Sequence, residues 1–155
     1  MSSFSREIRT IRALLAGSGW GVDPEVQLVL DEYSHFDGAR RLRKVERRTS
    51  LQIFHASRAF DSLLEHVVRW ENARPGSPIS SLPRYLTLGR SIHLIQKHRI
   101  NGGQFTPPTK DRLLDDLTRQ RNKFMHEACS FPTDSELARF LGDTLTGLQE
   151  IISWR

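Results

Sequence analysis

The sequence predicts an all-α protein, a single up-and-down bundle of four to six helices. Apolar residues recur at three- and four-residue steps along most of the chain, and no segment shows the alternation of a half-buried strand. Breaks rich in Gly and Pro separate these periodic stretches. With 155 residues, 37% of them hydrophobic and 26% charged, the composition is that of one ordinary globular domain. We therefore expect one domain over residues 1–155.

The N-terminal half contains the clearest helical pattern. A first helix is predicted over residues 5–16, and a short one after Asp23-Pro24, where Asp can cap and Pro suits the first turn. Residues 1–36 would thus be a helical extension or the first helix of the bundle. One long helix is predicted over about residues 37–71, because its apolar stripe has a period near 3.5. The stripe consists of Leu42, Val45, Thr49, Ile53, Ala56, Phe60, Leu63, Val67 and Trp70.

Three more helices are predicted in the C-terminal half. One covers residues 81–99 and places Tyr85 on its apolar face, and the next covers residues 110–128 after a Pro-Pro pair. Thr133 and Glu136 then have the spacing of a capping box. The last helix is expected to pack inward through Leu137, Leu141, Leu145, Leu148 and Ile152.

The net charge of +5 is concentrated in one short segment. Residues 38–48 hold six bases against the single acid Glu46, so the remainder of the chain is neutral overall. Such a run can face phosphate groups, or it can be a solvated helix end. Together with Lys123, the bases of this segment are candidate RNA-binding residues: Arg40, Arg41, Arg43, Lys44, Arg47 and Arg48.

Several classes of protein are not expected. No apolar run reaches the roughly 18 residues of a membrane span, and the polar N-terminus is not typical of a secretory signal. The single cysteine, Cys129, can form no intramolecular disulfide and supplies no thiolate set for zinc. We expect a reducing, cytoplasmic location, with Cys129 as a small packing residue.

The fourth helix carries an arginine where the pattern predicts an apolar residue. Position 121 falls on a stripe formed by Leu114, Leu117, Phe124 and Ala128, yet it is Arg121. An arginine on a packing face needs a partner, because an unpaired buried charge is costly. Either it extends outward or pairs with an acid such as Asp61 or Glu65, or this face lines a cleft or subunit interface where a phosphate is the partner.

Two further polar residues accompany Arg121. Asn122 and His126 are four residues apart, so their side chains are neighbours on a helix. Arginine can bind phosphate through two parallel hydrogen bonds, and imidazole exchanges protons near neutral pH. No carboxylates with metal-ligand spacing stand beside them. The segment therefore indicates phosphodiester chemistry without a metal.

This segment resembles the signature of HEPN domains, which are small helical bundles. In that family an arginine, usually followed by a polar residue, precedes a histidine by a few residues, and Arg121-Asn122-(x3)-His126 matches its commonest form. The order of elements agrees as well: a long helix, a motif-bearing penultimate helix, a Pro break and a final amphipathic helix. The resemblance covers about residues 37–155, the expected HEPN core.

The resemblance implies a metal-independent endoribonuclease that acts as a homodimer, of the kind found among toxins and antiviral-defence effectors. The 2′-hydroxyl would attack the adjacent phosphate, leaving 2′,3′-cyclic phosphate and 5′-hydroxyl ends. His126 would act as general acid or base, Arg121 would stabilise the phosphate charge, and Asp61 or Glu65 could support Arg121. No cofactor is expected. The expected partners are RNA, a second copy and an antitoxin or defence-complex protein, with no membrane.

Alternatives stay open at this point. The chain could be a non-catalytic helical module that dimerises or binds a partner, or a basic RNA-binding protein that uses residues 40–48 without cleavage. In one family branch, a tyrosine two residues after the histidine receives inhibitory nucleotides; here that residue is Ala128, so such control is not expected. The remaining histidines are expected to be structural or surface residues: His55, His66, His93 and His98.

Overall fold

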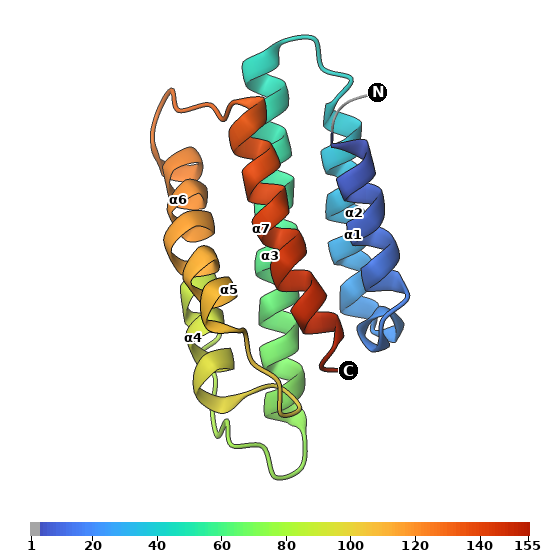
Figure 1. Cartoon of the computed structure of the whole chain (residues 1–155), viewed down its shortest axis with the longest axis vertical. Helices are drawn as coiled ribbons and strands as arrows, with labels where there is room; N and C mark the ends of the chain where they lie inside the picture. Colours follow the sequence, from blue (N-terminus) through green and yellow to red (C-terminus); the bar gives the residue numbers. More distant parts are fainter. Residues whose placement is uncertain (1–3) are drawn as a thin grey trace.

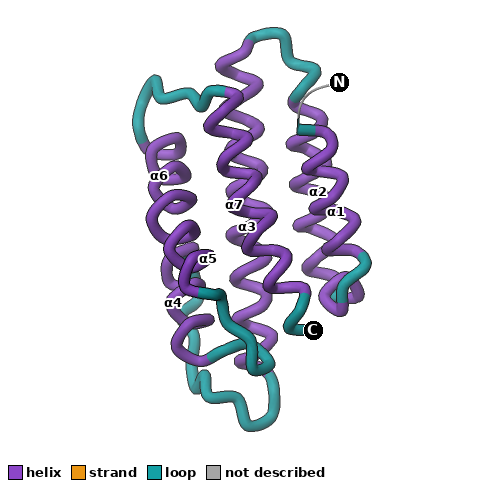
Figure 2. The backbone as a smooth tube through the Cα atoms, in the orientation of Figure 1, coloured by secondary structure: helices purple, strands orange, loops and turns teal. Residues whose placement is uncertain are grey.

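The computed structural model describes residues 4–155, so the first three residues of the predicted N-terminal extension lie outside it. As predicted, the described chain is helical; it contains no strand, and Ile100 and Gly103 form an isolated antiparallel bridge (Figure 2). Long helices α3 (Val45–Ala73) and α7 (Asp134–Ile152) run through the centre (Figure 1). Helices on either side are α1 (Ser5–Ala16) and α2 (Pro24–Ala39), and α4 (Leu88–His98), α5 (Pro107–Asp111) and α6 (Thr118–His126).

One continuous hydrophobic core joins these elements. It extends from Phe4 before α1 to Trp154 after α7, and its largest fully buried side chains include Trp20 and Phe60. Trp20 lies in the 3₁₀ turn η1 (Gly19–Val22), and its indole nitrogen donates to the carbonyl of Ile151 at 2.9 Å. Residues 4–36 therefore pack into the same core as the rest of the bundle. None of the helices in residues 4–155 is long and apolar enough to cross a membrane.

The long helix is confirmed, but it begins at Val45 instead of about residue 37. The predicted short helix after Asp23 extends through Gly38 to Ala39, and residues 40–44 form a loop. Four of those five residues are basic, and like charges on adjacent turns oppose helix formation. Leu42 and Val45 therefore lie outside the core, and Val45 is 56% exposed, whereas the stripe from Thr49 to Val67 is buried as predicted.

The third major helix is shorter than predicted. It begins at Leu88, where the Thr87 side chain accepts a hydrogen bond from the Arg90 backbone, and not near residue 81. The preceding segment is held in a non-helical path by Arg69, whose guanidinium donates to the carbonyls of Pro83 and Arg84. Tyr85, which was predicted to face the core, is 76% exposed for this reason.

The last helix agrees most closely with its prediction. Thr133 and Glu136 form both hydrogen bonds of the capping box, at 3.2 and 2.8 Å. Leu137, Leu141 and Leu148 are buried, while Leu145 and Ile152 are partly buried and pack against the core. Because α7 is fixed at its start by this cap, the α6–α7 loop ends at a defined point beside the motif.

Candidate functional site

Helix α6, which carries the predicted motif, buries none of its own residues. Phe124 packs partly against the core, whereas the polar side chains of Asn122, Lys123 and His126 are exposed. A helix that contributes so little to the core gains little stability from its packing. The side chains of α6 are therefore available for contacts with another molecule.

A π-helical segment, η2 (Arg112–Leu117), precedes α6 and sets its orientation. Its wider turn leads Thr118 to bond back to the carbonyl of Leu113 through both its backbone N–H and its hydroxyl, the latter at 2.8 Å. The predicted stripe is shifted as a result: Leu113 and Leu117 are fully buried, whereas Leu114 is 37% exposed. Arg121 stands one turn beyond Leu117 and is directed toward α3, while Ala128 is exposed and does not extend the stripe.

Arg121 pairs with Asp61 of α3, one of the partners considered from the sequence. Its Nη2 lies 3.2 Å from Oδ2 of Asp61, and the two side chains are 26% and 25% exposed. Its Nη1 donates to Oδ1 of Asn122 at 3.3 Å. The pair is incompletely satisfied, since Nε of Arg121 and Oδ1 of Asp61 are buried with no hydrogen-bond partner among the described residues. Each such atom costs about 1–3 kcal/mol, which offsets what the ion pair contributes to stability.

The carboxyl group of Asp61 is affected by its surroundings. Burial raises its pKa, and the nearby charge of Glu65 raises it further, while Arg121 lowers it. Glu65 itself is held by Arg69, 2.7 Å away, and makes no ion pair with Arg121. Of the two predicted supporting acids, Asp61 is therefore the one that contacts the motif.

Asn122 and His126 share a shallow hollow on the outer side of α6. The hollow has a volume of about 630 Å³ and is lined by Arg119, Asn122, Lys123, His126 and Glu127. His126, the last residue of α6, makes no side-chain hydrogen bond or ion pair with any residue from 4 to 155 that the structure describes. Arg121 is not among the lining residues. Within one chain, the predicted convergence thus brings the amide and the imidazole together but leaves the guanidinium on the neighbouring face.

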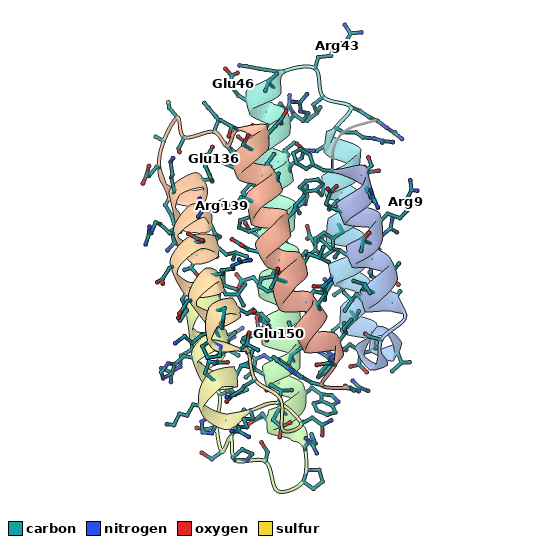
Figure 3. The ribbon with its side chains drawn as sticks, viewed as in Figure 1. Arg9, Arg43, Glu46, Glu136, Arg139 and Glu150 are labelled. Carbon is teal, nitrogen blue, oxygen red and sulfur yellow. The ribbon has the colours of Figure 1, made fainter. Side chains whose placement is uncertain are left out.

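The basic loop, residues 40–44, lies at the same end of the bundle as the C-terminal end of α6 (Figure 1). The N-terminus of α7 stands between them: Arg48 lies 3.7 Å from Asp134, and Lys123 lies 3.7 Å from Glu136. Figure 3 shows Arg43 at the tip of this end of the molecule and Glu136 on α7. The exposed bases and the motif therefore belong to one end of the molecule.

The basic residues differ in their partners. Arg40 lies 3.8 Å from Asp37 and donates to Ser5, and Lys44 lies 3.7 Å from Glu46. Arg41, Arg43 and Arg47 are exposed, and no ion pair of theirs occurs within residues 4–155. These three side chains are the most available for an anionic partner.

His55, His66 and Cys129 lie outside the motif. His55 and His66 bond to acids, Glu32 at 2.7 Å and Asp23 at 2.8 Å. Cys129 is exposed and has a positive φ of 59°, so the prediction that it is a packing residue is wrong. Exposed residues of a loop are not visible in helical periodicity, which is why the sequence pattern did not reveal this.

Sequence reasoning missed two residues of the hollow, Arg119 and Glu127. Arg119 lies one turn before Lys123 and three residues before Asn122, so the helical spacing could have indicated it. Glu127 follows the end of α6 in extended conformation and could not have been placed by periodicity. With Glu127, the hollow holds one carboxylate beside three basic side chains and an amide.

The comparisons with known proteins return nothing: no protein-family model, no curated protein and no solved structure matches the chain. The resemblance of the motif to that of HEPN domains therefore stays a hypothesis.

Proposed function

We propose that this protein is a metal-independent endoribonuclease of HEPN type, with its active site on α6. Arg121, Asn122 and His126 are its catalytic residues, and Asp61 holds Arg121 in place. The substrate is RNA, and the products carry 2′,3′-cyclic phosphate and 5′-hydroxyl ends. A role as a toxin or antiviral-defence effector, in the cytoplasm, is part of the same proposal.

The observation that supports this most strongly is the placement of Arg121. It stands where a buried apolar residue would stabilise the fold, and its pairing with Asp61 leaves buried polar atoms unsatisfied. Residues that break local packing rules without a gain in stability are expected at functional sites. Exposed His126 and Asn122 on the same short helix supply the groups that phosphodiester cleavage requires.

The chemistry needs three contributions. A base removes the proton of the 2′-hydroxyl as that oxygen bonds to phosphorus, and an acid protonates the departing 5′-oxygen. Imidazole can perform either step near neutral pH. The guanidinium of Arg121 stabilises the negative charge that builds on the phosphate, and Asn122, which accepts from Arg121 at 3.3 Å, orients it.

A second copy of the chain would complete the site. In one chain Arg121 and His126 occupy different faces of α6, so one chain does not surround a phosphate with both. The surface around α6 includes partly exposed apolar side chains, Leu114 at 37% and Phe131 at 48%, which could pack across a two-fold axis. In such a dimer one His126 serves as base and the other as acid.

The test is cleavage of a structured RNA in excess EDTA by nuclease-free protein. Wild type is compared with Arg121→Ala and His126→Ala, and with the matched controls Arg90→Ala and His93→Ala, both exposed on α4. Wild type and both controls should cleave, and the two motif variants should not. Full cleavage by His126→Ala would rule the proposal out. Sedimentation of the same samples reports whether the active species is a dimer.

A second candidate is RNA binding without cleavage, which the exposed Arg41, Arg43 and Arg47 favour. Such binding should weaken steeply with salt, because each neutralised phosphate releases counterions. If the protein binds RNA in the EDTA assay and leaves it intact, RNA binding without cleavage replaces the proposed nuclease function. If RNA is neither bound nor cleaved, a non-catalytic module that dimerises or binds a partner protein is favoured.

A further inference from the structure

A cluster of metal-binding side chains lies between α2 and α3. Glu32 and His35 extend from successive turns of α2, and His55 extends from α3. One ligand atom from each residue lies within 4.8 Å of the other two. Because α2 and α3 pack along their length and are joined by a five-residue loop, these three side chains are carried on a rigid pair of helices.

The donor set suits a transition metal. Two imidazoles and one carboxylate are the protein ligands of open zinc sites, which keep a fourth position for water. The Glu-x-x-His spacing places Glu32 and His35 on one face of the helix. Zinc bonds of about 2.0–2.1 Å would bring tetrahedral ligand atoms to roughly 3.3 Å from one another. His35 is exposed, so its side chain is free to rotate toward the other two ligands.

The surroundings of Glu32 orient it toward such a site. Its Oε2 lies 2.7 Å from Nδ1 of His55, while its Oε1 lies 3.3 Å from Nε of Arg58. Arg58 in turn lies over the ring of Phe54 at 5.5 Å, which restrains the guanidinium. One carboxylate oxygen is thus held by an outer partner and the other is directed at His55, as second-shell contacts orient ligands in metal sites. Glu32 and His55 are 17% and 19% exposed, so both are largely shielded from water.

The adjoining hollow favours a cation. It has a volume of about 540 Å³, and its lining includes the carboxylates Glu25, Asp31, Glu32 and Glu65 against the two arginines Arg58 and Arg69. The excess of acids gives a negative local potential that attracts a divalent cation. The hollow also gives a hydrated ion a path to the cluster.

His66, which also lines this hollow, differs from the histidines of the cluster in its partners. His66 bonds to Asp23 at 2.8 Å, and Glu25 lies 4.0 Å from its other ring nitrogen. Asp23 is also bonded by Arg155, which already neutralises it, and among the described residues His66 belongs to no group of three possible metal ligands. This arrangement is that of a structural ion pair, and it makes His66 a matched control.

We propose that Glu32, His35 and His55 form a zinc-class metal site, with water as the fourth ligand. Bound metal links α2 to α3 and stabilises the bundle. This site is separate from the proposed nuclease site, because Asp61 faces α6 and is six residues, about 9 Å along the helix axis, from His55. The proposal is independent of the proposed function, and each can fail alone.

The test is titration of chelator-treated protein with Zn²⁺ in competition with a chromophoric chelator, together with the visible spectrum of bound Co²⁺. Wild type should bind one ion with a tetrahedral Co²⁺ spectrum, and its melting temperature should rise. His35→Ala and His55→Ala should each weaken binding at least as much as the loss of an outer-shell partner, about 10- to 100-fold. His66→Ala and His93→Ala should bind as wild type does.

Circular dichroism of each metal-free variant reports whether it is folded. His35 is exposed, so His35→Ala keeps the test decisive if His55→Ala does not fold. Failure of wild type to compete for Zn²⁺ would overturn the proposal. So would binding that persists in His35→Ala or is lost in His66→Ala, since the ion would then be held elsewhere.

Discussion

Helices α6 and α7 are consecutive and differ in nearly every physical respect. α7 begins with a complete capping box and buries an apolar face that includes Leu137, Phe140 and Leu141. α6 continues directly from η2 and buries none of its own residues. The comparison shows that packing explains the sequence of α7 but not that of α6, whose arginine, amide and histidine need another explanation. The proposed nuclease activity is such an explanation, and substitutions in each of the two helices test the difference between them.

The largest effect is expected from His126→Ala. Removing a general acid or base lowers the rate of RNA cleavage by about 10²- to 10⁴-fold. Since His126 is exposed and has no side-chain partner in the described chain, the free energy of unfolding should change by less than about 0.5 kcal/mol. Initial cleavage rates and urea unfolding of the same preparation measure the two quantities. A fall in cleavage rate that is accounted for by a lower free energy of unfolding would contradict a catalytic role.

The opposite pattern is expected in α7. Leu141→Ala removes a fully buried side chain and should cost about 2–5 kcal/mol of unfolding free energy. The matched change in α6, Asn122→Ala, should cost about 0.5 kcal/mol or less, because Asn122 is exposed. Urea unfolding at one temperature compares them. If both variants lost equal stability, α6 would be a packing helix like α7.

A smaller effect is expected at the helix cap. Thr133→Ala removes the side-chain acceptor of the Glu136 backbone N–H and should cost about 0.5–2 kcal/mol. The capping bonds from Thr133 also lower the pKa of Glu136. Thr133→Ser keeps the hydroxyl and serves as the control in thermal unfolding. A loss of the same size in both variants would show that the cap is not the cause.

The smallest effect concerns pH and Asp61. Its pKa is raised in the folded protein by burial, so between the ordinary value and the raised value the folded state binds more protons than the unfolded state. The unfolding free energy of wild type should therefore fall, relative to Asp61→Asn, as pH rises from about 4 through this window. Unfolding at several pH values checks this. A difference that grows in the other direction would mean that Arg121 outweighs burial.

Elements whose cause is local could be predicted from the sequence. α1 and the cap of α7 have the predicted positions, because a Gly-rich stop and a capping box act within a few residues. The long helix was predicted to begin too early, because apolar periodicity takes no account of the repulsion among the bases of the loop at residues 40–44. The start of α4 was missed because Arg69, a distant residue, holds the preceding segment.

The residues of the candidate site could be predicted from the sequence, but their arrangement in space could not. The exchange of an apolar residue for Arg121 and the spacing of Asn122 and His126 are visible in the sequence. The π-helical turn, which shifts the buried stripe to Leu113, has no periodic signal. The proposed metal cluster was not visible either, since His55 and Glu32 meet only when α2 and α3 pack together.

The most direct measurement of the central claim is the chemical identity of the RNA ends formed in excess EDTA. Wild type is expected to leave 2′,3′-cyclic phosphate and 5′-hydroxyl ends, at a rate unchanged in His93→Ala and lost in His126→Ala. Ends of any other kind, no cleavage by wild type, or undiminished cleavage by His126→Ala would contradict the proposal that α6 carries a metal-independent ribonuclease site.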